Sequence, residues 1–206
     1  MVFSIFVVFL FSYFLGSVPF GLLLARVAGL GDIRAIGSGN IGATNVLRTG
    51  NKKVAAATLL LDGAKGAVAV LIVGAFLPDL AAVAGLGALL GHLFPVWLKF
   101  KGGKGVATGI GVITALAWPV GLAMMGTWLV VAKLFRISSL AALVAVGFVP
   151  LNVWVFGRGD FVPLPLSLVL VVLIFYKHRE NIRRLFTHTE PKIGASKNGA
   201  SPSERS

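Results

Sequence analysis

Long apolar stretches separated by short polar ones extend over most of the chain. Six stretches contain no Asp, Glu, Lys or Arg: residues 2–25, 66–78, 80–98, 105–132, 137–157 and 161–176. Several of them reach the roughly 20 residues that a helix needs to cross about 30 Å of hydrocarbon. The pattern therefore predicts an all-α, polytopic membrane protein. The first stretch lacks the basic start of a signal peptide, because the first charged residue is Arg26, so we interpret it as a retained span. Gly16, Ser17 and Pro19 predict a kink or a close-packing point within it.

The stretch from 106 to 132 decides the topology. The basic residues form four clusters, at 26–53, 99–104, 133–136 and 177–184. One helix over this stretch places the first two clusters on the opposite side of the membrane from the last two. Two short helices that turn at Trp118 and Pro119 place all four clusters on one side, and of the 19 basic residues only Arg158 then lies in a loop on the other side.

Because Lys and Arg accumulate in cytoplasmic loops, the charge distribution favours two helices over this stretch. The length of each is an objection, since about 13 residues rise only about 20 Å and segments of that size are more often re-entrant. We predict seven transmembrane helices, some of them short, with the N-terminus outside and the C-terminus in the cytoplasm.

The composition agrees with a membrane protein and narrows the chemistry. The 206 residues are 57% hydrophobic, and the mean hydropathy is +0.92. The net charge is +12, and its clustering between apolar stretches favours membrane topology and anionic ligands over nucleic acid. The chain has no cysteine, which excludes disulfides, a thiolate nucleophile and sulfur-ligated metals. Its three histidines have no metal-ligand spacing.

Two parts of the chain are expected to differ in order. Residues 1–186 are predicted to form a single integral membrane domain. Residues 187–206 are rich in Gly, Ser, Pro and Lys without apolar periodicity, which is typical of a disordered polar tail.

The segment from 37 to 48 breaks the apolar pattern. It carries small hydroxyl and amide side chains between glycines, and these offer many neutral hydrogen-bond groups to a ligand in a confined space. Arg48 has the planar guanidinium that binds a phosphate through two parallel hydrogen bonds. The alternative is a flexible loop followed by a helix that Asn45 caps. The density of polar residues favours a ligand site, with the candidates Ser38, Gly39, Asn40, Thr44, Asn45 and Arg48.

The segment from 99 to 105 is a basic, glycine-rich connector. Glycine lets backbone N–H groups point into one concavity, and the helix predicted to begin near Lys104 adds its positive end. Membrane topology alone explains Lys99 and Lys101. The number of glycines around Lys104 exceeds what such a loop needs, so we predict an anion site there. These glycines are Gly102, Gly103 and Gly105.

The segment from 176 to 185 is the third polar one. His178 and Asn181 share a helical face, whereas Glu180 and Arg184 have the spacing of an i,i+4 pair on another face. The segment resembles a ligand-binding helix, or alternatively a basic amphipathic helix that lies on anionic lipid.

Five further polar residues lie within or beside the apolar stretches. Asp62 and Lys65 are i,i+3 neighbours about 12 Å along a predicted span, which marks either a functional pair or a structural ion pair. His92 is a candidate general base, although a buried histidine with a satisfied hydrogen bond is commoner. Ser138 or Ser139 either caps the next helix or faces a ligand, and the frequency of serine at helix N-caps favours the cap.

The three polar segments carry long motifs in a fixed order. They read Gly37-Ser-Gly-Asn-x-Gly-Ala-Thr-Asn45-x-x-Arg48, Gly91-His-x-Phe-Pro-Val96 with Phe100-Lys-Gly-Gly-Lys-Gly-Val-Ala-Thr108, and Tyr176-x-His-Arg-Glu-Asn-Ile-x-Arg-Leu185. Together with Leu61-Asp-x-x-Lys-Gly66, they closely resemble the signature of the bacterial acyl-phosphate:glycerol-3-phosphate acyltransferase family. The resemblance extends from the first span to about residue 185.

The resemblance implies an enzyme of phosphatidic acid synthesis with seven helices and an active site at the cytoplasmic face of the bacterial inner membrane. The implied reaction transfers a fatty acyl group from acyl phosphate to the 1-hydroxyl of sn-glycerol 3-phosphate, giving lysophosphatidic acid and phosphate. An acyl phosphate is already activated, so no metal, cofactor or covalent intermediate is required, and positioning with charge neutralisation supplies most of the rate.

The residues predicted to act in catalysis are Ser38, Arg48, Lys104, His178 and Asn181. Those predicted to bind substrate are Gly39, Asn40, Thr44, Asn45, Gly102, Gly103, Gly105 and Ser139. Two groups are candidates for accepting the hydroxyl proton, the His178 imidazole and the phosphate of the acyl donor. Lys177 and Arg179 beside His178 favour its neutral form at pH 7.

Three other functions explain the sequence less well. A thioester-using glycerolipid acyltransferase has His-x-x-x-x-Asp, but the residues five positions after the three histidines are Trp97, Arg183 and Ile193. A transporter or channel for a small organic phosphate also needs cations and broken helices, yet transporters usually place the site between repeated halves, and this chain shows no internal repeat. A structural membrane subunit leaves the polar segments unexplained.

Overall fold

The computed structural model describes residues 1–156 and 164–193, and all regular secondary structure in this part of the chain is helical. The prediction of an all-α fold is confirmed. The α-helices are α1 (Val2–Gly16), α2 (Phe20–Val27), α3 (Ala43–Leu47), α4 (Lys52–Phe76), α5 (Ala81–Leu93), α6 (Val106–Leu116), α7 (Trp118–Phe135), α8 (Ser138–Gly147), α9 (Val149–Phe156), α10 (Leu164–Lys177) and α11 (Arg179–Phe186). Short 3₁₀ helices are η1 (Ile33–Ala35), η2 (Pro78–Leu80) and η3 (Val96–Leu98). Residues 157–163, which include the loop predicted to carry Arg158 on the other side of the membrane, and residues 194–206 lie outside the described residues.

Several helices have the length and composition of membrane spans. Among the described residues, four stretches qualify singly: Val2–Val27, Lys52–Phe76, Pro78–Leu98 and Trp118–Phe135. The pair α8 and α9, bent by 41°, forms a fifth candidate. Pro150 accounts for the bend, because it has no N–H and its ring clashes with the carbonyl four residues earlier. Helices α6 and α10 are apolar but shorter, with 11 and 14 residues.

Residue Ala117 separates α6 from α7. Its backbone is extended, with φ −150° and ψ 93°, and it ends α6. Pro119 lies in the first turn of α7, where its missing N–H removes no helical hydrogen bond. The predicted division of this stretch into two helices is confirmed. Helix α7 has 18 residues, so of the two only α6 is as short as the sequence suggested.

Helices α1 and α5 pack closely along faces that carry glycine. A Cβ atom on Gly91 would lie 2.0 Å from the Tyr13 carbonyl oxygen, and one on Gly16 would lie 2.1 Å from that of Ala88. The missing side chains therefore let the two backbones approach each other. Helix α1 ends at Gly16, and Pro19 separates it from α2, which is the kink that the sequence predicts.

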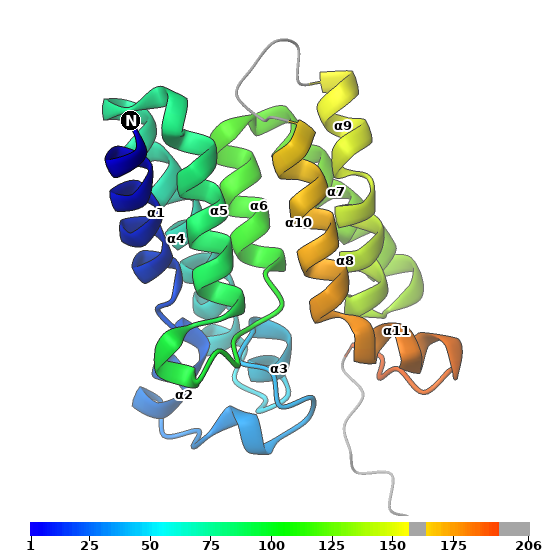
Figure 1. Ribbon diagram of the computed structural model, residues 1–206. Coiled ribbons are helices and arrows are strands. Elements are labelled where there is room, and N and C mark those ends of the chain that lie inside the picture. Colours follow the sequence, from blue (N-terminus) through cyan, green and yellow to red (C-terminus); the bar gives the residue numbers. More distant parts are fainter. Residues whose placement is uncertain (157–163, 194–206) are drawn as a thin grey trace, which may run out of the picture.

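The polar segments gather at one end of the helix bundle. Figure 1 shows α2, α3, the loop before α6 and α11 at the end opposite to the N-terminus. The connection between α2 and α4 is folded, because η1 and α3 pack against their neighbours through a small apolar cluster. Its buried members are Leu22, Ala25, Ile33, Ile41, Val46 and Ala55.

Candidate active site

Two of the predicted polar segments meet at Lys104. The next residue, Gly105, is the N-cap of α6 and has a left-handed φ of 85°, a conformation that favours glycine. The Lys104 ammonium donates to the Oδ1 atom of Asn181 in α11 at 2.5 Å, and Asn181 is buried. Segments 77 positions apart in the chain are therefore joined at one contact.

The glycines before Lys104 hold the loop against α5. The N–H of Gly102 donates to the Leu93 carbonyl at 3.2 Å, and that of Gly103 donates to the His92 carbonyl at 3.0 Å. A Cβ atom on Gly103 would lie 2.1 Å from the His92 Nε2 atom. These two glycines thus position Lys104 by close packing, and their N–H groups bind α5 instead of facing an open concavity as the sequence suggested.

Asn45 holds the first polar segment together. Its Nδ2 donates to the carbonyls of Ile33 and Ile36 at 2.7 and 3.2 Å, and its Oδ1 accepts the Ser38 N–H at 3.0 Å. The N-cap of α3 is Gly42, so the alternative in which Asn45 caps this helix is wrong. Because both ends of its amide bind within the loop, Asn45 shapes the segment that carries Ser38.

Arg48 packs over the start of this segment. A Cβ atom on Gly37 would lie 2.7 Å from the Arg48 Nη1 atom, and Gly37 has a left-handed φ of 55°. Asn40 lies nearby in the loop, where its Oδ1 accepts the Gly42 N–H at 3.1 Å. The hydroxyl of Thr44 lies 3.1 Å from that of Ser138, which connects the segment to the start of α8.

A cavity of about 450 Å³ lies between the first polar segment and η3. Lys99 and Phe100, at its edge, adopt left-handed φ angles of 50° and 62°, which are uncommon for residues with side chains. Gly39 therefore faces basic side chains at the surface and not the Lys104 contact. The lining residues are Arg34, Gly39, Trp97, Leu98, Lys99 and Lys101.

Ser139 does not cap α8. The helix begins at Ser138, and its N-cap is Ile137, which makes no side-chain cap. Prediction of a serine cap is therefore wrong. The buried Ser139 hydroxyl instead donates to the Glu190 carboxylate at 2.7 Å, which places Ser139 beside the C-terminal segment.

Sequence reasoning missed Glu190. It falls in the segment predicted as a disordered tail, but residues 187–193 are described and fold back onto the protein. Its carboxylate accepts from Asn181 Nδ2 at 2.5 Å and from Arg184 Nε at 2.6 Å. Arg184 therefore pairs with Glu190 and not with Glu180, as its helical spacing had suggested. A single acid in a segment without periodicity was too weak a signal to find it.

Positive charge exceeds negative charge around Lys104. Burial lowers the pKa of Lys104 to about 8. The charges of Arg184, Arg48 and Lys177 act in the same direction, while the Glu190 carboxylate acts against them. Three cations and one carboxylate thus act on the Lys104 ammonium, and this excess of positive charge favours a further anion such as a phosphate.

His178 is buried between α10 and α11. Its Nδ1 donates to the Ile174 carbonyl at 2.8 Å, which leaves the Nε2 lone pair as an acceptor. Burial and then the charge of Lys104 lower the pKa of His178 to about 4, so the imidazole is neutral at pH 7. The sequence predicts this neutral form from Lys177 and Arg179, but burial and Lys104 are the main causes.

Asp62 and Lys65 form a buried ion pair within α4. The Lys65 Nζ lies 2.7 Å from Asp62 Oδ1 and donates to the Val18 carbonyl at 2.8 Å. His92 Nδ1 lies 3.7 Å from the same carboxylate oxygen. These contacts join α4 to α5 and to the break between α1 and α2, which indicates a structural ion pair and a packed histidine. Within the described ranges, no group of three or more His, Asp or Glu side chains is placed to hold a metal ion.

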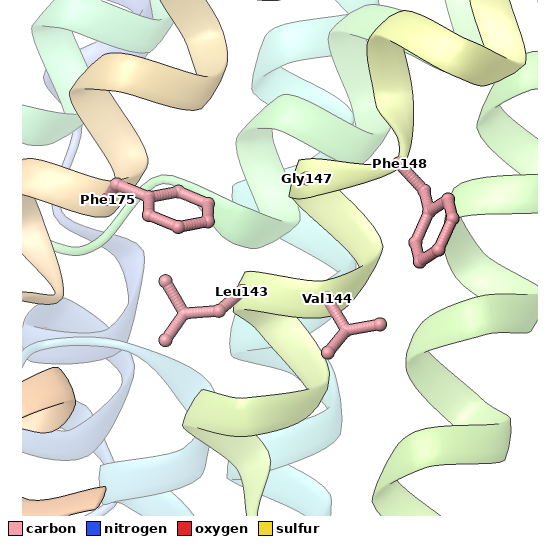
Figure 2. Close-up of a pocket in the computed structure, with 5 residues that line it drawn as sticks. All are labelled: Leu143, Val144, Gly147, Phe148 and Phe175. Carbon is pink, nitrogen blue, oxygen red and sulfur yellow. The ribbon is translucent and has the colours of Figure 1, made fainter. Parts of the chain in front are cut away.

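An apolar groove of about 300 Å³ lies on α8 beyond Ser139. Figure 2 shows the side chains of Leu143, from α8, and Phe175, from α10, facing each other across it. Leu143 follows Ser139 by four residues, about 6 Å along the helix axis. The groove therefore lies about one helical turn from Ser139, in the apolar part of the bundle. Its lining residues are Leu143, Val144, Gly147, Phe148 and Phe175.

The chain has relatives over nearly its whole length. A family model for glycerol-3-phosphate acyltransferase matches residues 6–188. The glycerol-3-phosphate acyltransferase of Mesorhizobium japonicum is 59% identical over 195 residues, which cover 95% of this chain and 99% of that relative. The enzyme of the same name from Brucella anthropi is 58% identical over 185 residues, covering 90% of this chain and 91% of the relative.

Two solved structures have the same fold. The crystal structure of PlsY (YgiH), an integral membrane glycerol 3-phosphate acyltransferase, in its glycerol 3-phosphate form matches with a TM-score of 0.85 and 40% identity, over 93% of this chain and 96% of that one. The lysophosphatidic acid form of PlsY gives a TM-score of 0.82 and 39% identity, over 92% and 95% of the two chains.

Proposed function

Because the chain belongs to the glycerol-3-phosphate acyltransferase family, and is thus a membrane enzyme of phospholipid biosynthesis, we propose that it acylates the 1-hydroxyl of sn-glycerol 3-phosphate with an acyl phosphate as donor. The products are lysophosphatidic acid and inorganic phosphate. The observation that carries this proposal is the partly buried Lys104 ammonium, which joins two polar segments where cations outnumber acids. Such a site suits two substrates that each bear a phosphate.

The chemistry that the site must supply supports acyl phosphate as the acyl donor. An acyl phosphate is a mixed anhydride and reacts without prior transfer to the enzyme, so it makes no use of a cysteine, which the chain lacks. The ester bond forms between the glycerol oxygen and the acyl carbon, and the bond from that carbon to the phosphate oxygen breaks. Lys104 and Arg48 neutralise the phosphate charges, and positioning of the hydroxyl against the carbonyl supplies most of the rate.

The hydroxyl proton passes to the phosphate in this proposal. His178 presents Nε2 as an acceptor, but a pKa of about 4 makes it a weak base at pH 7. A phosphate group has a pKa near 6 and is the better acceptor. We therefore assign His178 to orienting the hydroxyl through a hydrogen bond, and the leaving phosphate to taking the proton.

Five of the remaining predicted residues have one of two roles in this proposal. Ser38 lies on the Asn45-bound loop next to Arg48, from which it reaches a phosphate. Asn45 and the glycines at 102, 103 and 105 shape the backbone that presents these groups. The acyl chain lies along the apolar groove of α8 and α10, which begins one helical turn from Ser139.

We further propose seven crossings with the N-terminus outside and the site at the cytoplasmic face of the inner membrane. The crossings are α1 with α2, α4, α5, α6, α7, α8 with α9, and α10. The break at Ala117 and the gathering of the basic clusters at one end of the bundle support this topology. In this cysteine-free chain, Lys101→Cys and Lys192→Cys should react with an impermeant thiol reagent from the cytoplasm only, and Asp79→Cys from outside only. Labelling of Lys101→Cys and Asp79→Cys from the same side would rule it out.

The donor is tested with purified protein in lipid vesicles. The protein is given glycerol 3-phosphate with either acyl phosphate or acyl-CoA, and lysophosphatidic acid is measured. We expect product with acyl phosphate alone. Lys104→Ala should abolish most of this turnover, whereas Lys101→Ala, which removes an exposed lysine three positions away, should be mild. Turnover with acyl-CoA alone would refute the donor, and equal losses in the two variants would refute the assignment of Lys104.

A further inference from the structure

The carboxylate of Glu190 binds three side chains from two helices. It accepts from Ser139 of α8 at 2.7 Å, from Asn181 of α11 at 2.5 Å, and from Arg184 of α11 at 2.6 Å. Its side chain is only 7% exposed. The proposed function assigns no role to this residue, although it touches two of the predicted site residues directly.

The backbone around Glu190 is tied down on both sides. Before it, the N–H of Thr189 donates to the Arg184 carbonyl at 2.8 Å. After it, the N–H of Ile193 donates to the Arg136 carbonyl at 2.6 Å, and the Arg136 guanidinium donates back to the Ile193 carbonyl at 3.4 Å. The carboxylate is therefore held at a defined place between α8 and α11.

Glu190 remains ionised at neutral pH. Burial alone raises the pKa of a carboxyl, but the hydrogen bonds from Ser139, Asn181 and Arg184 outweigh it and hold the pKa of Glu190 below its usual value. An ionised carboxylate only accepts hydrogen bonds. Every group that contacts Glu190 must therefore turn a donor toward it.

This requirement fixes the direction of the Asn181 amide. One end of the amide donates and the other accepts. Since Nδ2 must face Glu190, Oδ1 faces the opposite way, and there it accepts from the Lys104 ammonium at 2.5 Å. An amide turned by 180° would place N–H groups against an ammonium, donor against donor. Glu190 thus sets which end of Asn181 meets Lys104.

From this geometry we infer that Glu190 is a positioning residue, which acts through Asn181 to hold the Lys104 ammonium at the phosphate site. The inference rests on the proposed function, in which Lys104 binds phosphate. The hydrogen bond to Glu190 also uses the only hydrogen of the Ser139 hydroxyl, so that Ser139 can only accept a hydrogen bond from substrate. Glutamine at 190 carries both a donor and an acceptor, and it therefore no longer dictates the direction of the amide.

Two variants and a matched control test the inference in lipid vesicles with acyl phosphate and glycerol 3-phosphate. Glu190→Gln should lower kcat/KM by about 10- to 100-fold, the size of a lost charge-assisted hydrogen bond. Glu190→Asp keeps the charge but has a side chain shorter by one methylene, so it should also lower kcat/KM. Glu180→Gln removes an exposed acid from α11 that does not contact Asn181 or Lys104 through a hydrogen bond, and it should leave kcat/KM unchanged.

The pH profile separates positioning from anchoring of the tail. The Glu190 charge raises the pKa of Lys104 against the effects of burial and of Arg184, Arg48 and Lys177. In Glu190→Gln the loss of activity at alkaline pH should therefore begin at lower pH, while in Glu190→Asp it should stay in place. A residue that only anchors the chain would lower the melting temperature and leave both kcat/KM and this profile of the folded enzyme unchanged.

A double mutant completes the test. In the Asn181→Ala background, Glu190→Gln should cost little more, because the route to Lys104 is already broken. Fully additive losses would overturn the inference. So would a lower KM for glycerol 3-phosphate in Glu190→Gln, since that result would show the carboxylate competing with substrate phosphate. Failure of the proposed function is recognised separately, by a Lys104→Ala enzyme that keeps its turnover.

Discussion

The pKa of Lys104 predicts an alkaline limit to activity. In the proposed function the ammonium binds phosphate, and its pKa of about 8 lies well below that of an ordinary lysine. If only the protonated form binds phosphate, kcat/KM for glycerol 3-phosphate should fall by about tenfold per pH unit above pH 8. The substrate phosphate ionises near pH 6, so it does not titrate in this range.

The measurement is kcat/KM from pH 6 to 10 at constant ionic strength in lipid vesicles. It reports the free enzyme, in which no phosphate yet stabilises the ammonium. Lys104→Arg keeps a positive charge whose pKa exceeds 12, so its profile should stay flat up to pH 10, although its activity at pH 7 should be lower because a planar guanidinium does not replace a compact ammonium. Lys101→Arg should keep the native profile.

The same profile shows how the reasoning fails. An alkaline fall that persists in Lys104→Arg with its midpoint near pH 8 would assign the titration to another group. A native enzyme that keeps full kcat/KM at pH 10 would show that burial does not destabilise the ammonium as the structure indicates.

Three further predictions concern single side chains. His178→Asn should lower kcat by less than about 10²-fold and leave any fall at acidic pH in place, because in the proposed function a histidine of pKa about 4 orients the hydroxyl and does not take its proton. Loss of the acidic fall would contradict this. Asn45→Ala should reduce the melting temperature as well as activity, since the residue holds the loop that carries Ser38; an unchanged melting temperature would leave it a purely ligand-binding role. Lys65→Met should lower the free energy of unfolding by roughly 3–5 kcal/mol, because it leaves the buried Asp62 carboxylate without its partner. Adding Asp62→Asn should recover part of this loss in thermal unfolding. Additive losses would exclude a coupled pair.

Much of the helical plan could be predicted from the sequence. The division at Ala117 followed from the distribution of lysine and arginine, which responds to the membrane and not to local helix propensity. The kink at Pro19 followed from a residue that has no N–H. The contact of Lys104 with Asn181 was not predicted as such. Lys104 was predicted as an anion site from the glycines around it, and Asn181 as a site residue from the family resemblance.

Apart from the serine cap of α8, which is a local error, the main errors concern contacts between segments distant in the chain. Helical spacing predicts a pair between Glu180 and Arg184, yet Arg184 binds Glu190 because the chain after α11 turns back. Likewise, the N–H groups of Gly102 and Gly103 bind carbonyls of α5, a partner that no pattern around residue 100 reveals. Periodicity reports which face a residue occupies, and it carries no information on which distant backbone will pack there.

The break between α1 and α2 links three residues, Pro19, Lys65 and Asp62, that we expect to change together among relatives. The carbonyl of Val18 lies beside Pro19, which has no N–H, and it receives the ammonium of Lys65, whose charge is balanced by Asp62. A continuous helix would take up that carbonyl itself and leave the buried lysine with one partner fewer. A relative that lacks the proline should therefore be more stable if it also lacks the lysine and the aspartate, and we expect the three residues to be kept or lost together.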